Sequence, residues 1–236
     1  MRVEPYGLDS YLHVMKRGAR GMPLTRHIDD RARFPRLLYY LNDENQIDQW
    51  ERTVHSLAPF ERPAAWPERL PLVKILAWVL MPNHFHLILK PLQEKGVAKF
   101  MQRLCGSMSM HYNAKYQDKG SLFQGSYKSR TINTDGHLQV LPAYVMVKNV
   151  FELYPGGLRR AVGEFDRAWN WALRYPFSSL PAYAAGAKSP IIDKDLLGER
   201  YPTAEEFYRQ ARELMELRAA AAEEESKILK ALAFED

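Results

Sequence analysis

The spacing of apolar side chains divides the chain into short strands and longer helices. Alternating or wholly apolar runs bounded by Gly, Pro or Asn predict strands at residues 10–18, 72–80, 84–90 and 121–132. Apolar residues at helical spacing predict helices at residues 27–45, 95–116 and 134–154. Pro35 interrupts the first helix, and Pro142 predicts a kink or a fresh start in the last one.

The predicted order is β-α-β-β-α-β followed by a helix, which is typical of a ferredoxin-like fold. We therefore expect an α+β protein, with a ferredoxin-like βαββαβ antiparallel sheet and helices on one face. After residue 155 the pattern changes to a loop-rich aromatic stretch, and residues 203–232 predict one long exposed helix. Residues 1–158 are assigned to the sheet domain, and residues 159–236 to a loop-rich and helical C-terminal extension.

Composition limits the class of protein. The chain has 236 residues, 46% of them hydrophobic, so it can bury a sizeable core. Its one cysteine, Cys105, excludes an intramolecular disulfide and favours a reducing cytoplasm. No apolar stretch is long enough for a transmembrane helix, so we expect a cytoplasmic protein without a membrane partner.

Charge is unevenly distributed along the chain. The whole sequence carries +5, but residues 201–236 hold 5 Lys/Arg against 9 Asp/Glu and so carry −4. The preceding 200 residues therefore carry +9. A basic body favours a polyanionic partner, of which nucleic acid is the commonest.

Two histidines stand out in the segment "VLMPNHFHLILK". On a strand, His84 and His86 point to the same side, and Phe85 and Leu87 point to the other. Two imidazoles on one face offer two ligands to a divalent metal, although a third ligand must come from elsewhere in the fold. The alternative is a pair of partly exposed histidines without a ligand.

Several segments together resemble a known family. "MPNHFHLIL" resembles the His-hydrophobic-His strand of single-tyrosine HUH transposases, specifically the REP-associated tyrosine transposase branch. "YLHVMKRGARG" with "DDRARFPRLL" resembles the opening strand and first helix of that family. "LFQGSYKSR" resembles its basic fourth strand, and "AWNWALRYPFSSLPAY" the segment after the catalytic helix. The matches follow the family order over most of residues 10–185.

The resemblance implies a DNA strand transferase with Tyr144 as its nucleophile. In such an enzyme Mg²⁺ or Mn²⁺ on His84 and His86 activates a DNA phosphodiester, and the tyrosine becomes linked to the 5′ end of the break. Periodicity alone would instead place Tyr144 in a buried stripe with Val140, Val147 and Phe151.

One position departs from the family pattern. The family has an amide side chain four residues after the tyrosine as a third metal ligand, but that position here is Lys148. The amide of Asn149 comes one residue later. A local bulge in the helix could bring Asn149 to the metal, the third ligand could be different, or the metal site could be impaired.

Basic residues flank the strands that would carry this site. The candidate DNA-binding residues are Arg17, Arg20, Lys128 and Arg130, with Tyr127 as a candidate to stack on an unpaired base. Each of these charges taken singly could equally be an ordinary solvated group. The resemblance implies single-stranded DNA near a small hairpin as the partner, and the sequence leaves a monomer and a homodimer both open.

Three hypotheses follow from these residues. The first is an active transposase that cleaves and rejoins single-stranded DNA through Tyr144. The second is an impaired or domesticated relative that binds hairpin DNA without cutting it. The third is a metal-dependent hydrolase that uses His84 and His86 to activate water.

Overall fold

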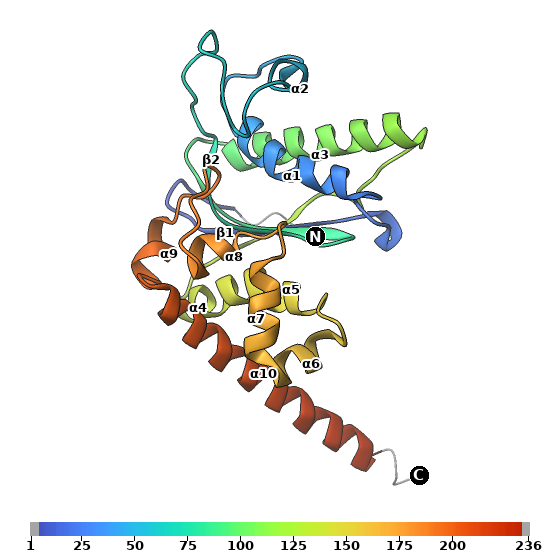
Figure 1. Cartoon of the computed structure of the whole chain (residues 1–236), viewed down its shortest axis with the longest axis vertical. Coiled ribbons are helices and arrows are strands. Elements are labelled where there is room, and N and C mark those ends of the chain that lie inside the picture. The colour runs from blue at the N-terminus through green and yellow to red at the C-terminus, as the bar shows by residue number, and fades with distance from the viewer. Residues whose placement is uncertain (1–4, 233–236) are drawn as a thin grey trace.

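A four-stranded antiparallel sheet forms the middle layer of the protein (Figure 1). The structure is a computed structural model that describes the backbone of residues 5–232 and the side chains of residues 5–221. The strands are β1 (Leu12–Arg17), β2 (Val73–Leu80), β3 (His84–Pro91) and β4 (Lys128–Thr131), in the spatial order β2-β3-β1-β4. Strand β1 therefore lies between β3 and β4, and β2 forms one edge of the sheet.

Helices cover both faces of this sheet. The helices before β4 are α1 (Ile28–Tyr40), α2 (Trp50–Thr53) and α3 (Gly96–Tyr116), with a short 3-10 turn at Ala19–Gly21. After β4 come α4 (Asp135–Ala143), a π turn (Tyr144–Lys148), α5 (Asn149–Phe151), α6 (Gly157–Gly163), α7 (Phe165–Leu173), α8 (Leu180–Ala184), α9 (Asp195–Arg200) and α10 (Ala204–Leu232). Figure 1 shows α1 and α3 on one side of the sheet and α4, α5, α7 and α10 on the other.

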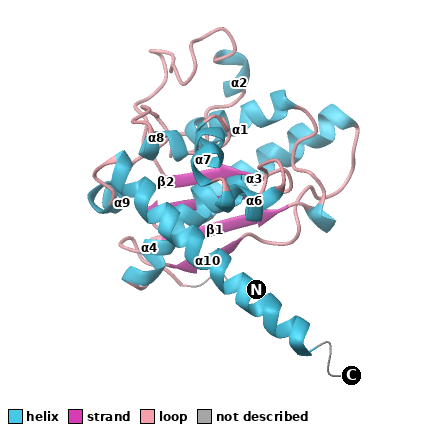
Figure 2. Ribbon diagram, turned by 60° about the horizontal axis from the view of Figure 1, so that its bottom comes forward, coloured by secondary structure: helices cyan, strands magenta, loops and turns pink. Residues whose placement is uncertain are grey.

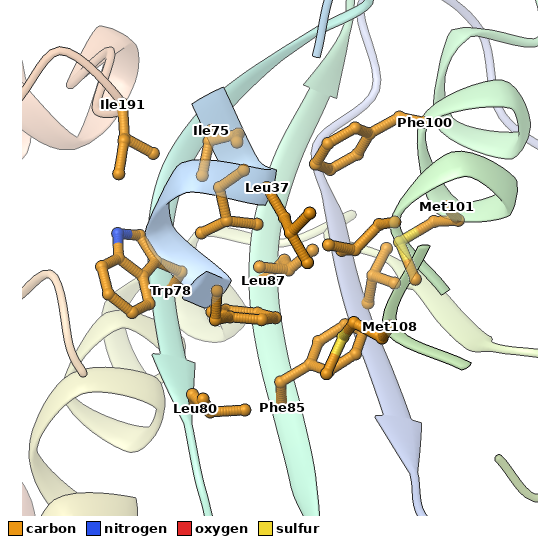
Figure 3. Packing of buried hydrophobic residues seen from close by; sticks show 14 of the residues in the cluster. Leu37, Ile75, Trp78, Leu80, Phe85, Leu87, Phe100, Met101, Met108 and Ile191 are labelled. Carbon is orange, nitrogen blue, oxygen red and sulfur yellow. The ribbon is translucent and has the colours of Figure 1, made fainter. Parts of the chain in front are cut away.

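One side, which we call the packed face, carries the alternate β3 residues Phe85, Leu87 and Leu89. These side chains are fully buried in a cluster with apolar residues of β2, α1 and α3. Figure 3 shows Leu37 of α1 and Phe100, Met101 and Met108 of α3 gathered along the same side of the strands as Phe85 and Leu87. At about 25 cal/mol for each Å² of apolar surface removed from water, this cluster supplies much of the driving force for folding.

The opposite side carries His84, His86 and Ile88, and we call it the histidine face. A second apolar cluster lies there, formed by β2, by the chain from Leu138 to Tyr154 and by α7, α8 and α10. In α10 the buried residues Phe207, Ala211 and Met215 recur at helical spacing and attach its first half to the cluster.

The prediction of helices on one face was thus incomplete. The crossover helices α1 and α3 lie on a single face, but the helices after β4 cover the other. The stretch expected to be loop-rich contains α6 to α9, and the first half of α10 is packed and not exposed. Beyond residue 221 only the backbone of α10 is described, and it extends away from the body (Figure 2).

Two other predicted elements differ in detail. Strand β4 begins at Lys128 and not at residue 121, because Ser121 bonds locally to Phe123 and Gly125 adopts a positive φ of 56°. The helix containing Pro35 continues to Tyr40 despite the missing N–H. No helix within residues 5–232 is long and apolar enough to cross a membrane.

The edge of β2 is covered by the segment that follows α7. Ser179 Oγ accepts the backbone N–H of Trp78 at 2.9 Å, and the Leu80 N–H donates to the Phe177 carbonyl at 2.9 Å. Tyr183 Oη donates to the Leu76 carbonyl at 2.7 Å. These bonds satisfy polar groups of an otherwise open sheet edge and attach the C-terminal region to the sheet.

Candidate active site

Strand register places the two histidines next to the first strand. In the antiparallel pairing of β1 with β3, His84 lies opposite Arg17 and His86 lies opposite Met15. Opposed residues of an antiparallel pair point to the same face, so Arg17 shares the histidine face. The rings of His84 and His86 lie 5.0 Å apart between centroids, in an edge-on arrangement.

Tyr144 lies beside His86. Its ring centroid is 5.7 Å from that of His86, and the two rings are perpendicular. The side chain is half-buried and packs against the second apolar cluster, so its ring contributes to packing while the residue stays partly accessible. The helix after β4 therefore brings Tyr144 onto the face that carries both histidines.

A third histidine, which the sequence analysis did not identify, belongs to the same group. His13 Nε2 lies 2.8 Å from His86 Nδ1, and the His13 ring stacks on that of His86 and lies 6.1 Å from that of Tyr144. The alternation of β1, with Leu12 and Val14 buried in the packed face, could have placed His13 on the opposite side. Only the pairing of β1 with β3, however, brings it to His86.

The hydrogen bonds of the two strand histidines leave one ring nitrogen of each available. Asn83 Nδ2 donates to the Gly21 carbonyl, so its Oδ1 faces His84 and accepts from Nδ1 at 2.7 Å. His86 Nδ1 is occupied by His13. In the tautomers with a proton on both Nδ1 atoms, Nε2 of His84 and of His86 carries a free lone pair. A partner on the second nitrogen is the usual arrangement of metal-binding histidines, so these residues fit a metal ligand role.

Burial keeps all three imidazoles neutral at neutral pH. Desolvation lowers the pKa of His13 to about 4, with a further contribution from the charge of Arg130. Desolvation, then the neighbouring His13, His84 and Lys148, lower the pKa of His86 to about 2. Desolvation also lowers the pKa of His84, which Glu152 partly offsets. Neutral imidazoles are the form that binds metals.

The turn after Tyr144 is a π turn and not an α-helical turn. The Asn149 N–H bonds to the Tyr144 carbonyl, five residues earlier. In a regular α-helix residue i+5 points well away from residue i, whereas a π turn has more residues per turn and rotates residue i+5 back toward the side of residue i. The helix thus contains the irregularity considered from the sequence. Asn149 is 1% exposed, and its Nδ2 donates to the Val145 carbonyl at 3.3 Å.

Lys148 also lies beside the tyrosine. Its ammonium group is 5.1 Å from the centroid of the Tyr144 ring and 2.5 Å from a carboxylate oxygen of Glu152. Glu152 is a second residue that the sequence analysis missed, since an acid one turn after a lysine is ordinary on any helix surface. Within residues 5–221, no group of three or more His, Cys, Asp or Glu side chains is arranged to hold a metal ion.

The candidate DNA-binding residues do not all lie together. Arg130 is opposite His13 and Lys128 is opposite Met15 in the β1–β4 pairing, so both share the histidine face with Arg17. Arg20 is exposed in the turn that follows β1. Tyr127 packs instead against the cluster of the packed face, where burial, then its partner Tyr6, raises its pKa to about 12.

Comparison with known proteins identifies a family for part of the chain. Residues 71–148 match the sequence model of a family described as "Transposase IS200 like". The matched segment includes both strand histidines and Tyr144. The resemblance to single-tyrosine transposases is confirmed over this segment.

Other comparisons are more distant. No curated protein matches the sequence. Among solved structures, one described as "Structure of the REP associates tyrosine transposase bound to a REP hairpin" matches with a TM-score of 0.40 and 13% identity. The match covers 83% of this chain and 92% of that chain.

Proposed function

We propose that the protein cleaves and rejoins single-stranded DNA through Tyr144, because residues 71–148 match the model of the IS200-like transposase family. The observation that carries this proposal is the position of the Tyr144 ring, 5.7 Å from that of His86. A phenol has a pKa near 10 and is a weak nucleophile, so it needs an activated phosphate beside it. A pair of neutral imidazoles with free Nε2 atoms provides the place for that activation.

Each step of the proposed reaction exchanges one phosphate ester bond for another. The Tyr144 hydroxyl oxygen forms a bond to the phosphorus, and the bond from phosphorus to the 3′ oxygen breaks. The tyrosyl proton is given up and the leaving 3′ oxygen takes up a proton. The 5′ end remains attached to Tyr144 until another 3′ hydroxyl attacks and releases it, so rejoining needs no ATP.

We propose that His84 and His86 hold Mg²⁺ or Mn²⁺ through their Nε2 atoms, with Asn149 as third protein ligand. When bound, the ion polarises a non-bridging phosphate oxygen and stabilises the departing 3′ oxygen. The π turn supports the assignment of Asn149, because a turn with more residues than an α-helical one rotates the fifth residue after the nucleophile toward the side of the nucleophile. Asn83 and His13 orient the two imidazoles.

Arg17, Lys128 and Arg130 are proposed to bind the DNA backbone. They lie on the histidine face, beside the proposed cleavage site, and all three are exposed. Arginine and lysine side chains on one surface bind phosphates without reading sequence. A single strand next to a hairpin is the proposed substrate.

The deciding experiment is covalent capture of DNA. Wild-type protein with Mg²⁺ or Mn²⁺ and single-stranded DNA from its own flanking repeats should give an adduct on a denaturing gel. Tyr144→Phe should give none, while Tyr39→Phe, which removes a hydroxyl from the distant helix α1, should behave as wild type. Metal-dependent cleavage that survives Tyr144→Phe would instead establish the hydrolase hypothesis.

A second function is favoured by one observation at the same site. Lys148 replaces the amide of the family pattern and places a cation beside Tyr144, where a metal ion would be repelled. The protein would then bind DNA without cutting it. Lys148→Asn separates the two functions: if only this variant forms the adduct, the natural chain is a binding protein, and if wild type forms it, Lys148 is compatible with catalysis.

A further inference from the structure

A cavity of about 270 Å³ opens beside the proposed nucleophile. Its polar lining comes from four different elements: His13 of β1, Arg130 of β4, His137 of α4 and Arg218 of α10, with Tyr144 at one side. Its apolar lining includes Ile132, Val140 and Leu141. The cavity is therefore a positively charged recess next to the tyrosine.

Arg218 reaches this recess from the far end of the sequence. Its guanidinium carbon lies 5.5 Å from the centroid of the Tyr144 ring. The helix is held in place by its buried stripe, in which Met215 is the last buried residue within 204–221 and lies one turn before Arg218. Arg218 thus follows the stripe at helical spacing and is directed along the same side of α10.

The two arginines of the recess differ from the lysine nearby. Lys148 is paired with the carboxylate of Glu152. Neither Arg130 nor Arg218 has a carboxylate partner among the residues whose side chains the structure describes. Two permanently charged guanidinium groups that line one small cavity repel each other. An anion bound between them would offset this electrostatic repulsion. Their planar forks match the oxygens of a phosphate.

We infer that this cavity binds a phosphodiester of the DNA strand beside Tyr144, with Arg218 of the C-terminal helix as one of its two arginine ligands. The inference rests on the proposed strand transfer at Tyr144 and adds to it a residue outside the transposase-matching segment. It also gives the C-terminal region a role in the site: α10 supplies a substrate ligand that the sheet domain lacks. The apolar wall of the cavity is suited to the sugar or base attached to that phosphate.

Arg218→Ala in the full-length protein is the test, and Arg209→Ala is the matched control. Arg209 lies on the same helix with its side chain 73% exposed, and its partner is Glu206. Binding of a fluorescein-labelled single-stranded oligonucleotide is measured by anisotropy over a range of salt concentrations. We expect Arg218→Ala to bind about tenfold more weakly. The slope of the logarithm of the affinity against the logarithm of the salt concentration (the salt slope) should become less steep by about 0.7 units. Arg209→Ala should match wild type.

A conservative variant separates geometry from charge. Arg218→Lys keeps the charge, so its salt slope should stay close to wild type, but it loses the planar fork. With saturating DNA, both Arg218 variants should therefore form the adduct more slowly than wild type. The inference is overturned if Arg218→Ala binds DNA with the affinity and salt slope of Arg209→Ala, whether or not an adduct forms. If no protein forms an adduct but Arg218→Ala weakens binding, the strand-transfer proposal fails while the phosphate site stands.

Discussion

The packed face and the histidine face are built from alternate residues of the same strand, yet they are filled very differently. On the packed face, Phe85 lies between Phe34 and Phe123 with ring centroids 5.3 and 6.1 Å away, and it is fully buried. On the histidine face, His86 is almost as deeply buried, but its neighbours are two imidazoles and a phenol.

The difference lies in what each face contributes to the free energy of folding. Burying phenylalanine is favourable in itself, whereas burying imidazoles costs desolvation that their hydrogen bonds only partly offset. Polar groups that are buried at a cost in stability are typical of functional sites, so the histidine face is the expected place for catalysis. Substitutions on the two faces should therefore separate stability from activity.

The largest loss of stability is expected from Phe85→Ala. Removing a fully buried phenylalanine leaves a cavity between α1, α3 and the sheet, and the free energy of unfolding should fall by about 4 kcal/mol. Chemical denaturation measures this change. Leu92→Ala, at a side chain that is 40% exposed, should lose much less. Equal losses in the two variants would contradict the assignment of the packed face as the main source of stability.

A smaller loss, about 2 kcal/mol, is expected from Asp30→Ala, which removes the acceptor of several charge-assisted hydrogen bonds. Burial alone would raise the pKa of Asp30, but hydrogen bonds from Lys115, Tyr116 and the backbone N–H groups of Arg26 and His27 outweigh it and lower that pKa well below its ordinary value. The lysine bond is 2.6 Å long and joins α1 to α3.

This depressed pKa predicts acid sensitivity. The stabilisation by Asp30 is complete above the unfolded pKa of about 3.9 and is lost as the pH falls toward the lower folded pKa. Asp30→Ala should therefore flatten the dependence of unfolding free energy on pH below about pH 4, and the exposed neighbour variant Asp29→Ala should not. Identical acid denaturation in wild type and Asp30→Ala would exclude this role.

On the histidine face the expected effect on stability is smaller still. His84→Ala removes a half-buried ring and should cost about 1 kcal/mol or less. Adduct formation should nevertheless be lost, and EDTA should abolish it in wild type. Thermal unfolding and the denaturing gel together test this contrast. A variant that retains full cleavage would remove His84 from the proposed metal site.

The smallest effect on folding is expected from Lys128→Ala, an exposed substitution that should change stability by less than about 0.5 kcal/mol. Its effect should appear only in DNA binding, where the affinity should depend less steeply on salt, with a slope smaller in magnitude by about one unit. Titrations at several salt concentrations measure that slope. A salt-independent affinity in wild type would show that the basic surface does not bind phosphates.

Much of the sheet could be predicted from the sequence because alternation and turn residues are local signals. The strands containing Val73–Leu80 and His84–Pro91 and the helix Gly96–Tyr116 lie close to their predicted bounds. Strand β4 was predicted too long, because the apolar Leu122 and Phe123 are buried as strand residues would be, although they lie outside β4 and form only an isolated β-bridge, from Phe123 to Gly18. Burial of a residue does not by itself reveal its backbone conformation.

The site could be predicted only in part, because its members meet through strand pairing and tertiary packing. His84 and His86 share a face by local alternation alone. His13 joins them only through the pairing of β1 with β3, and Arg218 only because α10 folds back over the sheet. The π turn at Tyr144–Lys148 follows Pro142 closely, and the sequence indicates an irregularity there but not its type.

The most direct test of the central proposal is to locate the tyrosine that becomes linked to DNA. Wild-type protein is incubated with single-stranded DNA and Mn²⁺, the adduct is digested with trypsin and nuclease, and the nucleotide-bearing peptide is identified by mass spectrometry. We predict that it is the peptide spanning residues 131–148, in which Tyr144 is the one tyrosine. A nucleotide on a peptide that contains Tyr112 or Tyr116, or the absence of any adduct while DNA is bound, would contradict the account.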